Sequence, residues 1–150
     1  MARRARRFRR SKNAKADLLG DVRLFRTCTK HELARIASLV DEVDAPKGKV
    51  IVREGAPGRE CFVIAEGKAK ATIRGKGSAV LGPGSFFGEM SLLDQGPRSA
   101  TVKAETDMHL LVLGSREFST LVNEVPTVAV RMMRGLAERL RSAERRQPEH

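Results

Sequence analysis

Cysteine and histidine are scarce in this chain of 150 residues, which contains Cys28, Cys61 and the three histidines His31, His109 and His150. Two cysteines are too few for a disulfide framework or a four-thiolate iron–sulfur cluster, and we expect both to be small buried hydrophobic residues. The histidines are scattered and form no pair at metal-ligand spacing, which disfavours a haem or metal sensor. We therefore expect a protein without a resident metal or cofactor.

Long apolar runs are also missing from the sequence. No stretch approaches the roughly 18 to 20 apolar residues of a membrane span. The basic N-terminus is not followed by the apolar stretch of a secretory signal. The length fits one domain with a hydrophobic core and leaves little room for a second. These observations predict a cytoplasmic, single-domain protein.

Acidic residues are absent from the first fifteen positions, which hold eight of the 29 lysines and arginines. The remaining 21 basic residues face 18 acidic ones, so most of the formal net charge of +11 lies in this segment. Phe8 is its one aromatic residue, and little else in it can be buried, so we expect residues 1–15 to form a disordered basic arm. Such an arm either binds polyanions weakly or serves as a solvated tail.

Helical patterns flank a central region of glycine-separated short strands. A short helix is expected over Ala16–Phe25, and a capping box at Thr29–Glu32 begins a second one. Ser115 can cap a helix reaching about Asn123, and Pro126 is suited to begin a long helix that ends near Arg145. The expected strands are Lys49–Arg53, Cys61–Ala65, Ala69–Arg74, Ala79–Leu81, Ala100–Ala104 and His109–Leu113.

Strands this short and closely spaced favour an antiparallel jelly-roll β-barrel. The predicted fold class is therefore α+β, with N-terminal helices before the barrel and two helices after it, the last one long. Residues 16–146 would form the domain and residues 147–150 a tail. The last helix carries a heptad-like apolar seam of Ala129, Met133, Leu136, Leu140 and Ala143. This seam either packs on its own barrel or pairs with a second copy, and we expect a homodimer through it.

Residues 82–101 carry the most specific chemistry in the chain. Gly88 lets the backbone approach a ligand closely, and Glu89–Leu93 has enough helix formers for a short helical turn, whose free N–H groups attract an anion. Pro97 fixes the backbone before Arg98, whose planar fork can bind two phosphate oxygens. Ser99 adds a hydroxyl donor and its own N–H. This combination predicts a site for a phosphate ester.

Glu89 needs a separate explanation, because a carboxylate is repelled by a phosphate. An ionised carboxylate only accepts hydrogen bonds, so Glu89 requires a ligand hydroxyl near the phosphate, such as a ribose 2′-OH. The alternative is a glycine-rich hairpin in which Glu89 and Arg98 merely pair with each other across a surface. Spacing, order and residue type favour the ligand site.

The sequences Phe87-Gly88-Glu89-Met90-Ser91-Leu92 and Pro97-Arg98-Ser99-Ala100-Thr101 resemble the phosphate-binding cassette of cyclic nucleotide-binding domains. This family includes the bacterial catabolite activator protein, the regulatory subunits of cyclic AMP-dependent kinase and cyclic nucleotide-gated channels. The resemblance runs from about Leu24 to Ala143. It implies a ligand site made of Gly88, Glu89, Met90, Ser91, Pro97, Arg98, Ser99 and Ala100.

Within that site the resemblance implies that Glu89 binds the ribose 2′-OH and Arg98 the cyclic phosphate. Gly88, Ser99 and Ala100 would then make the remaining phosphate contacts. Ser99 favours cyclic AMP, as in the bacterial relatives, with cyclic GMP as the alternative. The threonine and serine that contact adenine in catabolite activator proteins align with Ala143 and Glu144, just after Ser142. No aromatic residue follows Phe118, so a lid over the base must be aliphatic or use an arginine such as Arg139, Arg141 or Arg145.

The resemblance implies a regulatory sensor domain in which the nucleotide shifts the C-terminal helices by its differential affinity for two states. We expect no winged helix-turn-helix or other effector part, because the chain ends at His150. The alternative is a protein that binds nucleic acid or an anionic surface through the basic arm, with the barrel as scaffold. An enzyme is least expected, because making or hydrolysing a cyclic phosphate needs a cluster of metal-binding carboxylates or histidines.

Overall fold

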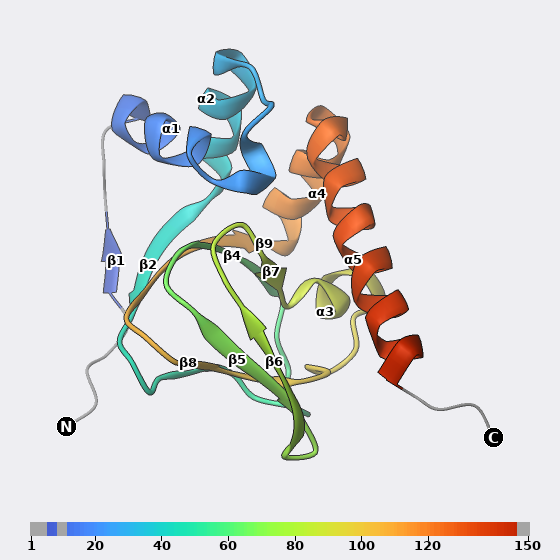
Figure 1. Cartoon of the computed structure of the whole chain (residues 1–150). Helices are drawn as coiled ribbons and strands as arrows, with labels where there is room; N and C mark the ends of the chain where they lie inside the picture. Colours follow the sequence, from blue (N-terminus) through green and yellow to red (C-terminus); the bar gives the residue numbers. More distant parts are fainter. Residues whose placement is uncertain (1–5, 9–11, 147–150) are drawn as a thin grey trace.

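The computed structural model describes residues 6–8 and 12–146 (Figure 1). The helices of this part are α1 (Lys12–Gly20), the short 3-10 helix η1 (Arg23–Phe25), α2 (Lys30–Leu39), α3 (Glu89–Asp94), α4 (Ser115–Glu124) and α5 (Pro126–Arg146). The strands are β1 (Arg6–Phe8), β2 (Asp41–Ala45), β3 (Val50–Val52), β4 (Glu60–Glu66), β5 (Ala69–Ile73), β6 (Lys76–Leu81), β7 (Phe86–Phe87), β8 (Thr101–Ala104) and β9 (Met108–Gly114).

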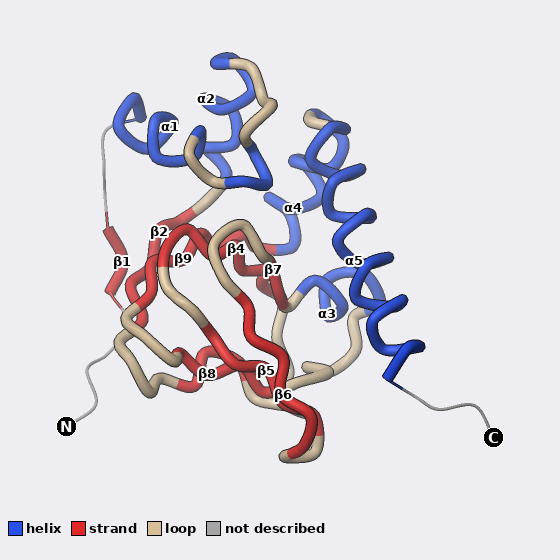
Figure 2. Tube along the Cα trace, viewed as in Figure 1, coloured by secondary structure: helices blue, strands red, loops and turns tan. Residues whose placement is uncertain are grey.

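The strands form two antiparallel sheets with the orders β1-β2-β9-β4-β7 and β3-β8-β5-β6. Figure 2 shows both sheets at the centre, with α1 and α2 against one end and α4 and α5 along one side. The α+β prediction with an antiparallel jelly roll is confirmed. The strands lie in two separate sheets instead of one closed barrel, because their ladder pairings do not link the two sheets.

The core has two layers because β4 and β9 are buried on both faces. Cys61 and Val63 of β4 face the helices, whereas Phe62 and Ile64 face the second sheet. Leu111 and Leu110 of β9 alternate in the same way. Successive side chains of a strand point to opposite faces, so these strands read as continuous apolar runs. Helices α1, α2, α4 and α5 contribute the outer layer of the core.

The ends of the helices follow the expected sequence signals in part. Thr29 accepts a hydrogen bond from the backbone N–H of Glu32, and the Glu32 carboxylate accepts one from the N–H of Thr29, so the capping box is confirmed. The predicted start of α5 at Pro126 is also confirmed. Ser115 was expected to cap α4, but Gly114 is the N-cap residue and Ser115 is the first helical residue.

The expected disordered arm is wrong for the part of it that the structure describes. Arg6–Phe8 forms strand β1, which pairs with β2, and α1 begins at Lys12, upstream of the expected domain boundary at residue 16. In the pairing register Arg6 stands opposite Asp44. Residues 1–5 and 9–11 of the arm, and the expected tail 147–150, lie outside the described residues.

Strand β2 carries a buried polar cluster with its neighbour β9. His109 is 6% exposed, and its Nε2 lies 2.6 Å from Oε1 of Glu42, which is 1% exposed. The other ring nitrogen, Nδ1, lies 2.8 Å from Oδ1 of Asp44, its cross-strand partner. The cluster joins β2 to the central strand β9, and β4 separates β9 from β7 of the 82–101 segment in the same sheet.

No helix within the described ranges is both long and apolar enough to cross a membrane.

Candidate functional site

The backbone around Gly88 can be built only with glycine. Gly88 lies in the left-handed region, with φ of 85° and ψ of −1°, and is the N-cap residue of α3. A Cβ at this position would lie 2.7 Å from the carbonyl oxygen of Glu60 and 2.8 Å from Nη1 of Arg98. Gly88 therefore gives the chain its turn into α3 and also leaves room for the arginine.

Arg98 is held at both its backbone and its side chain. Its N–H donates to the carbonyl of Ala56 at 2.9 Å, and its own carbonyl accepts from the N–H of Gly55 at 2.8 Å. Its Nη1 donates to the carbonyls of Glu60 at 2.8 Å and Gly88 at 3.1 Å. Arg98 is only 6% exposed. The guanidinium is thus fixed beneath the turn that begins α3.

Burial sets the charge properties around this arginine. It lowers the pKa of the Arg98 guanidinium, while the negative charges of Glu60 and Glu89 act in the opposite direction. The buried Cys61 thiol has its pKa raised to about 12, first by burial and then by the carboxylate of Glu89. The site therefore combines a desolvated cation with a thiol held in its neutral form.

The carboxylate of Glu89 is 5% exposed and belongs to the first turn of α3. Its Oε1 accepts a hydrogen bond at 3.1 Å from Nη1 of Arg139, which lies in α5. Arg139 also donates from Nη2 to the carbonyl of Phe86, and its Cζ lies 4.5 Å from the centroid of the Phe86 ring. One side chain of α5 therefore contacts both β7 and α3.

The structure brings together three of the predicted site residues, namely Gly88, Glu89 and Arg98. The ion pair of Glu89 is made with Arg139, and the hydrogen bonds of the Arg98 guanidinium go to backbone carbonyls, in contrast to the hairpin alternative. The other predicted residues differ in their exposure. Ser91 is 2% exposed, Met90 is 45% exposed, Pro97 and Ser99 are exposed, and Ala100 is half-buried.

Ser91 has one further property. Its hydroxyl oxygen is fully buried and has no hydrogen-bond partner among the described residues. A buried hydroxyl without a partner is costly, so it is typical of a position where a ligand or water completes the bonding.

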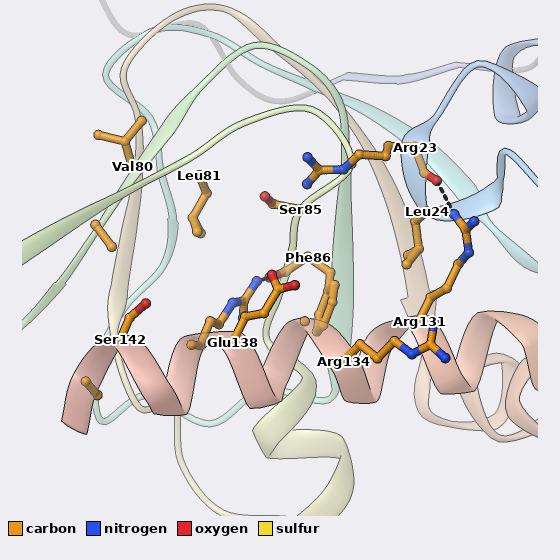
Figure 3. Close-up of a pocket in the computed structure, with 15 residues that line it drawn as sticks. Arg23, Leu24, Val80, Leu81, Ser85, Phe86, Arg131, Arg134, Glu138 and Ser142 are labelled. Atoms are coloured by element: carbon orange, nitrogen blue, oxygen red, sulfur yellow. Dashed lines mark hydrogen bonds between the residues drawn. The ribbon is translucent and has the colours of Figure 1, made fainter. Parts of the chain in front are cut away.

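A cavity of about 740 Å³ lies beside the cassette, between η1, the β6–β7 turn and α5 (Figure 3). Val80 and Leu81 form one wall, and Glu138 and Ser142 project from α5 toward it. Phe86 and Arg139 line the cavity and also contact the cassette, so they lie between the two regions. At the far end, Nη1 of Arg131 donates to the carbonyl of Arg23 at 2.7 Å.

Some contributors to the site come from distant parts of the sequence. Arg139 was among the arginines considered for a lid, whereas Glu60 and Phe62 were not anticipated as neighbours of the cassette. Phe62 stacks on Phe87 at 5.0 Å between centroids, and its ring lies 5.8 Å from Cζ of Arg98. The sequence Gly55-Ala56-Pro57-Gly58 precedes Glu60 and Phe62, and by itself it indicates only a turn.

The described residues contain no group of three or more histidine, cysteine or acidic side chains that could hold a metal ion. The charged groups at the site are the buried guanidinium of Arg98 and the buried carboxylate of Glu89.

Comparison with known proteins identifies relatives with the same arrangement of elements. Residues 42–125 match the family model described as cyclic nucleotide-binding domain. The cyclic AMP receptor protein of Thermus thermophilus is 40% identical over 104 residues, which are 66% of this chain and 48% of that protein. A cAMP-dependent protein kinase regulatory subunit of Neurospora crassa is 34% identical over 112 residues, 73% of this chain and 29% of the subunit.

The crystal structure of a cyclic nucleotide-binding domain from Methylobacillus flagellatus is similar with a TM-score of 0.76 and 25% identity, covering 95% of this chain and 86% of that one. The chain spans about half of the Thermus receptor and under a third of the Neurospora subunit. The family model and the fold agree over most of the chain. We conclude that the chain belongs to the cyclic nucleotide-binding domain family.

Proposed function

We propose that the chain is a regulatory domain that binds a cyclic nucleotide, with cyclic AMP as the favoured ligand, and passes the binding event to helix α5. The observation that carries this proposal is the placement of two opposite charges, Arg98 and Glu89, on either side of the Gly88 turn, both nearly buried. A cyclic nucleotide has the matching groups, one phosphate anion and one ribose hydroxyl donor. The role is binding, and no chemical step is assigned to the site.

The phosphate is the part of the ligand for which Arg98 is suited. A guanidinium presents five N–H donors, and the two hydrogen bonds of the Arg98 side chain both use Nη1. Its remaining donors match two phosphate oxygens, and its low exposure strengthens that attraction. The backbone N–H groups that follow Gly88 add neutral donors to the same anion.

The ribose and the base then lie on the α5 side. Glu89 accepts a hydrogen bond from Arg139. A ribose 2′-OH that donates to Glu89 therefore either displaces this hydrogen bond or adds a second one to the same carboxylate. The cavity beyond Arg139 and Phe86 is the space for the base. Ser99 supports cyclic AMP over cyclic GMP, as the sequence resemblance implies.

The proposed coupling runs through Arg139. This side chain donates hydrogen bonds to Glu89 of α3 and to the carbonyl of Phe86 in β7, so a change in either contact alters how α5 is held. A ligand can shift the position of α5 only by binding one arrangement of this contact more tightly than another.

Isothermal titration calorimetry of the wild-type chain with cyclic AMP and cyclic GMP tests the proposed function. Arg98→Ala should weaken binding by about 2 to 4 kcal/mol, or roughly 30- to 1,000-fold, because a desolvated charge-assisted contact is lost. Arg59→Ala is the matched control, since Arg59 is exposed and carries the same charge. Failure of the wild-type chain to bind either nucleotide at millimolar concentration would contradict the proposal.

We also infer that two copies of the chain associate through α5. Val128 and Met132 of this helix are buried in the domain, whereas Met133 and Leu140 are 59% and 61% exposed. The helix therefore keeps a second apolar face after one face has packed on its own domain, and a second copy of α5 is the occupant that matches it in length and character.

The basic segment at the N-terminus supports a further, independent proposal of weak polyanion binding. Arg6 and Arg7 of this segment lie in the short strand β1. Arginine contacts with the phosphate backbone carry no sequence information, so binding should be independent of sequence. Deletion of residues 1–5 leaves β1 in place. Fluorescence anisotropy with a labelled oligonucleotide at low salt should then show weaker binding than the full chain.

A further inference from the structure

The side chain of Arg98 crosses directly over Gly58, a residue of the turn before β4. An ideal Cβ built on Gly58 would lie 2.1 Å from Nε of Arg98, and 2.4 Å from both Cζ and Nη2. Carbon atoms of real side chains do not approach other atoms to less than about 3 Å, because repulsion rises steeply at such separations. The observed position of the guanidinium therefore requires glycine at position 58.

The guanidinium is confined on its other sides. Nη1 is fixed by the carbonyls of Glu60 and Gly88, and the Phe62 ring lies 5.8 Å from Cζ. Within the described part of the chain, Nε and Nη2 have no hydrogen-bond partner. A Cβ on Gly58 would overlap the part of the guanidinium, Nε, Cζ and Nη2, that carries these remaining donors.

The backbone conformation at position 58 does not by itself require glycine. Gly55 and Gly88 have φ values of 82° and 85°, in the region that favours glycine, whereas Gly58 is not among the residues with positive φ. The atoms that a Cβ would meet all belong to the end of one flexible side chain. An alanine at position 58 can therefore fit the fold if the Arg98 guanidinium moves away.

We propose that Gly58 is a positioning residue for the phosphate of the nucleotide. By lacking a side chain, it allows the Nε–Nη2 edge of Arg98 to lie where it can bind two phosphate oxygens together. A methyl group at position 58 displaces this edge and weakens the contact without removing the charge. This inference rests on the proposed function, because the phosphate is the ligand group that the edge would hold.

The test is calorimetry with cyclic AMP and cyclic GMP on Gly58→Ala, together with thermal unfolding. We expect affinity to fall roughly tenfold or more, with a melting temperature within about 2 °C of wild type. Gly20→Ala in α1 is the matched control, because a Cβ there meets only Cδ1 of Leu33, at an ordinary contact distance of 3.4 Å, and φ is not positive. That variant should bind as the wild type does.

A double mutant separates positioning from a general effect on the fold. In the Arg98→Ala background, Gly58→Ala should cause no further loss of affinity, because the side chain that it displaces is gone. An equal loss in both backgrounds would overturn the proposal, as would wild-type affinity in the Gly58→Ala variant. If the wild-type chain binds neither nucleotide, the proposed function fails and the inference falls with it.

A measurement without nucleotide addresses the geometry alone. In ¹⁵N-labelled protein the Nε–H resonance of Arg98, assigned with Arg98→Lys, should shift or broaden in Gly58→Ala and stay in place in Gly20→Ala. An unchanged Arg98 resonance in Gly58→Ala would contradict the displacement on which the proposal depends.

Discussion

Arg139 and Glu89 are fifty positions apart in the sequence, yet Nη1 of Arg139 donates to Oε1 of Glu89 at 3.1 Å. The carboxylate is nearly buried, and the arginine is partly open to solvent. Because Arg139 also contacts the ring and the carbonyl of Phe86, the pair connects the last helix to the segment expected to bind the nucleotide.

Replacing Arg139 with methionine should loosen the C-terminal half of α5. Methionine keeps an apolar stem over Phe86 but cannot donate to Glu89 or to the Phe86 carbonyl. We expect faster hydrogen–deuterium exchange in residues 139–146 of the nucleotide-free protein, measured by mass spectrometry. Arg141→Met, at an exposed position two residues away, is the control and should exchange as the wild type does. Identical exchange in all three proteins would show that the contact does not hold the helix.

Replacing Glu89 with glutamine should weaken cyclic AMP binding through the ribose. The amide is a poorer acceptor than a carboxylate, and we expect a loss of about 1 to 2 kcal/mol for a hydrogen bond to a charged group. With 2′-deoxy cyclic AMP the loss should nearly vanish, because the donor is missing. Calorimetry with both ligands measures the difference. An equal loss for the two ligands would mean that Glu89 acts elsewhere.

A charge on the exposed face of α5 should separate the proposed dimer. Leu140→Glu places a carboxylate in the predicted contact, and we expect a monomer by sedimentation velocity with an unchanged circular dichroism spectrum. Leu136 is less suitable, because it packs against the core. Thr127→Glu is the control, since Thr127 is exposed on the same helix. A wild-type monomer at high concentration, with and without nucleotide, would refute the dimer.

Cys61 should react slowly with thiol reagents in the folded protein. It is 0% exposed, and its pKa of about 12 leaves little thiolate at pH 8. In a Cys28→Ser variant, Ellman's reagent at pH 8 should modify Cys61 only after unfolding or opening of the site. Addition of nucleotide should slow the reaction further. Rapid modification of Cys61 in the native protein would show that the region around Glu89 opens readily.

The same thiol has a consequence for stability at high pH. Its pKa is raised in the folded state, so the unfolded state loses its proton first as pH rises above about 9. Stability contributed by the neutral thiol is therefore present below pH 9 and is lost above it. Chemical denaturation of wild type and Cys61→Ala between pH 8 and 10.5 should show a steeper decline in the wild type.

The cassette could be predicted because its chemistry is local in the sequence. Gly88, Glu89 and Arg98 lie within eleven consecutive positions, and the turn and helix between them follow from residue type alone. The partners of Arg98 could not be predicted in this way. Glu60 and Phe62 reach it only through the pairing of β4 with β7, and Gly58 only through the turn before β4.

Strand β2 was missed for a related reason. Its sequence, Asp-Glu-Val-Asp-Ala, has three acidic residues and low strand propensity. It forms a strand because β9 and β1 pair with its two edges, and because His109 lies between the carboxylates of Glu42 and Asp44. Tertiary contacts here outweigh local preference, and β1 is a strand only because β2 is one.

The length of α5 places the Arg139 contact far from the start of the same helix. The helix has 21 residues, and Arg139 lies thirteen residues after Pro126, a distance of about 20 Å along the axis. A tilt of about 10° at Arg139 would therefore move the start of the helix by about 3 Å. Between these points, Nη1 of Arg131 donates a hydrogen bond to the carbonyl of Arg23 in η1. If the coupling through Arg139 proposed above holds, a rearrangement at Glu89 would therefore be accompanied by a displacement at η1 and at the α4–α5 junction.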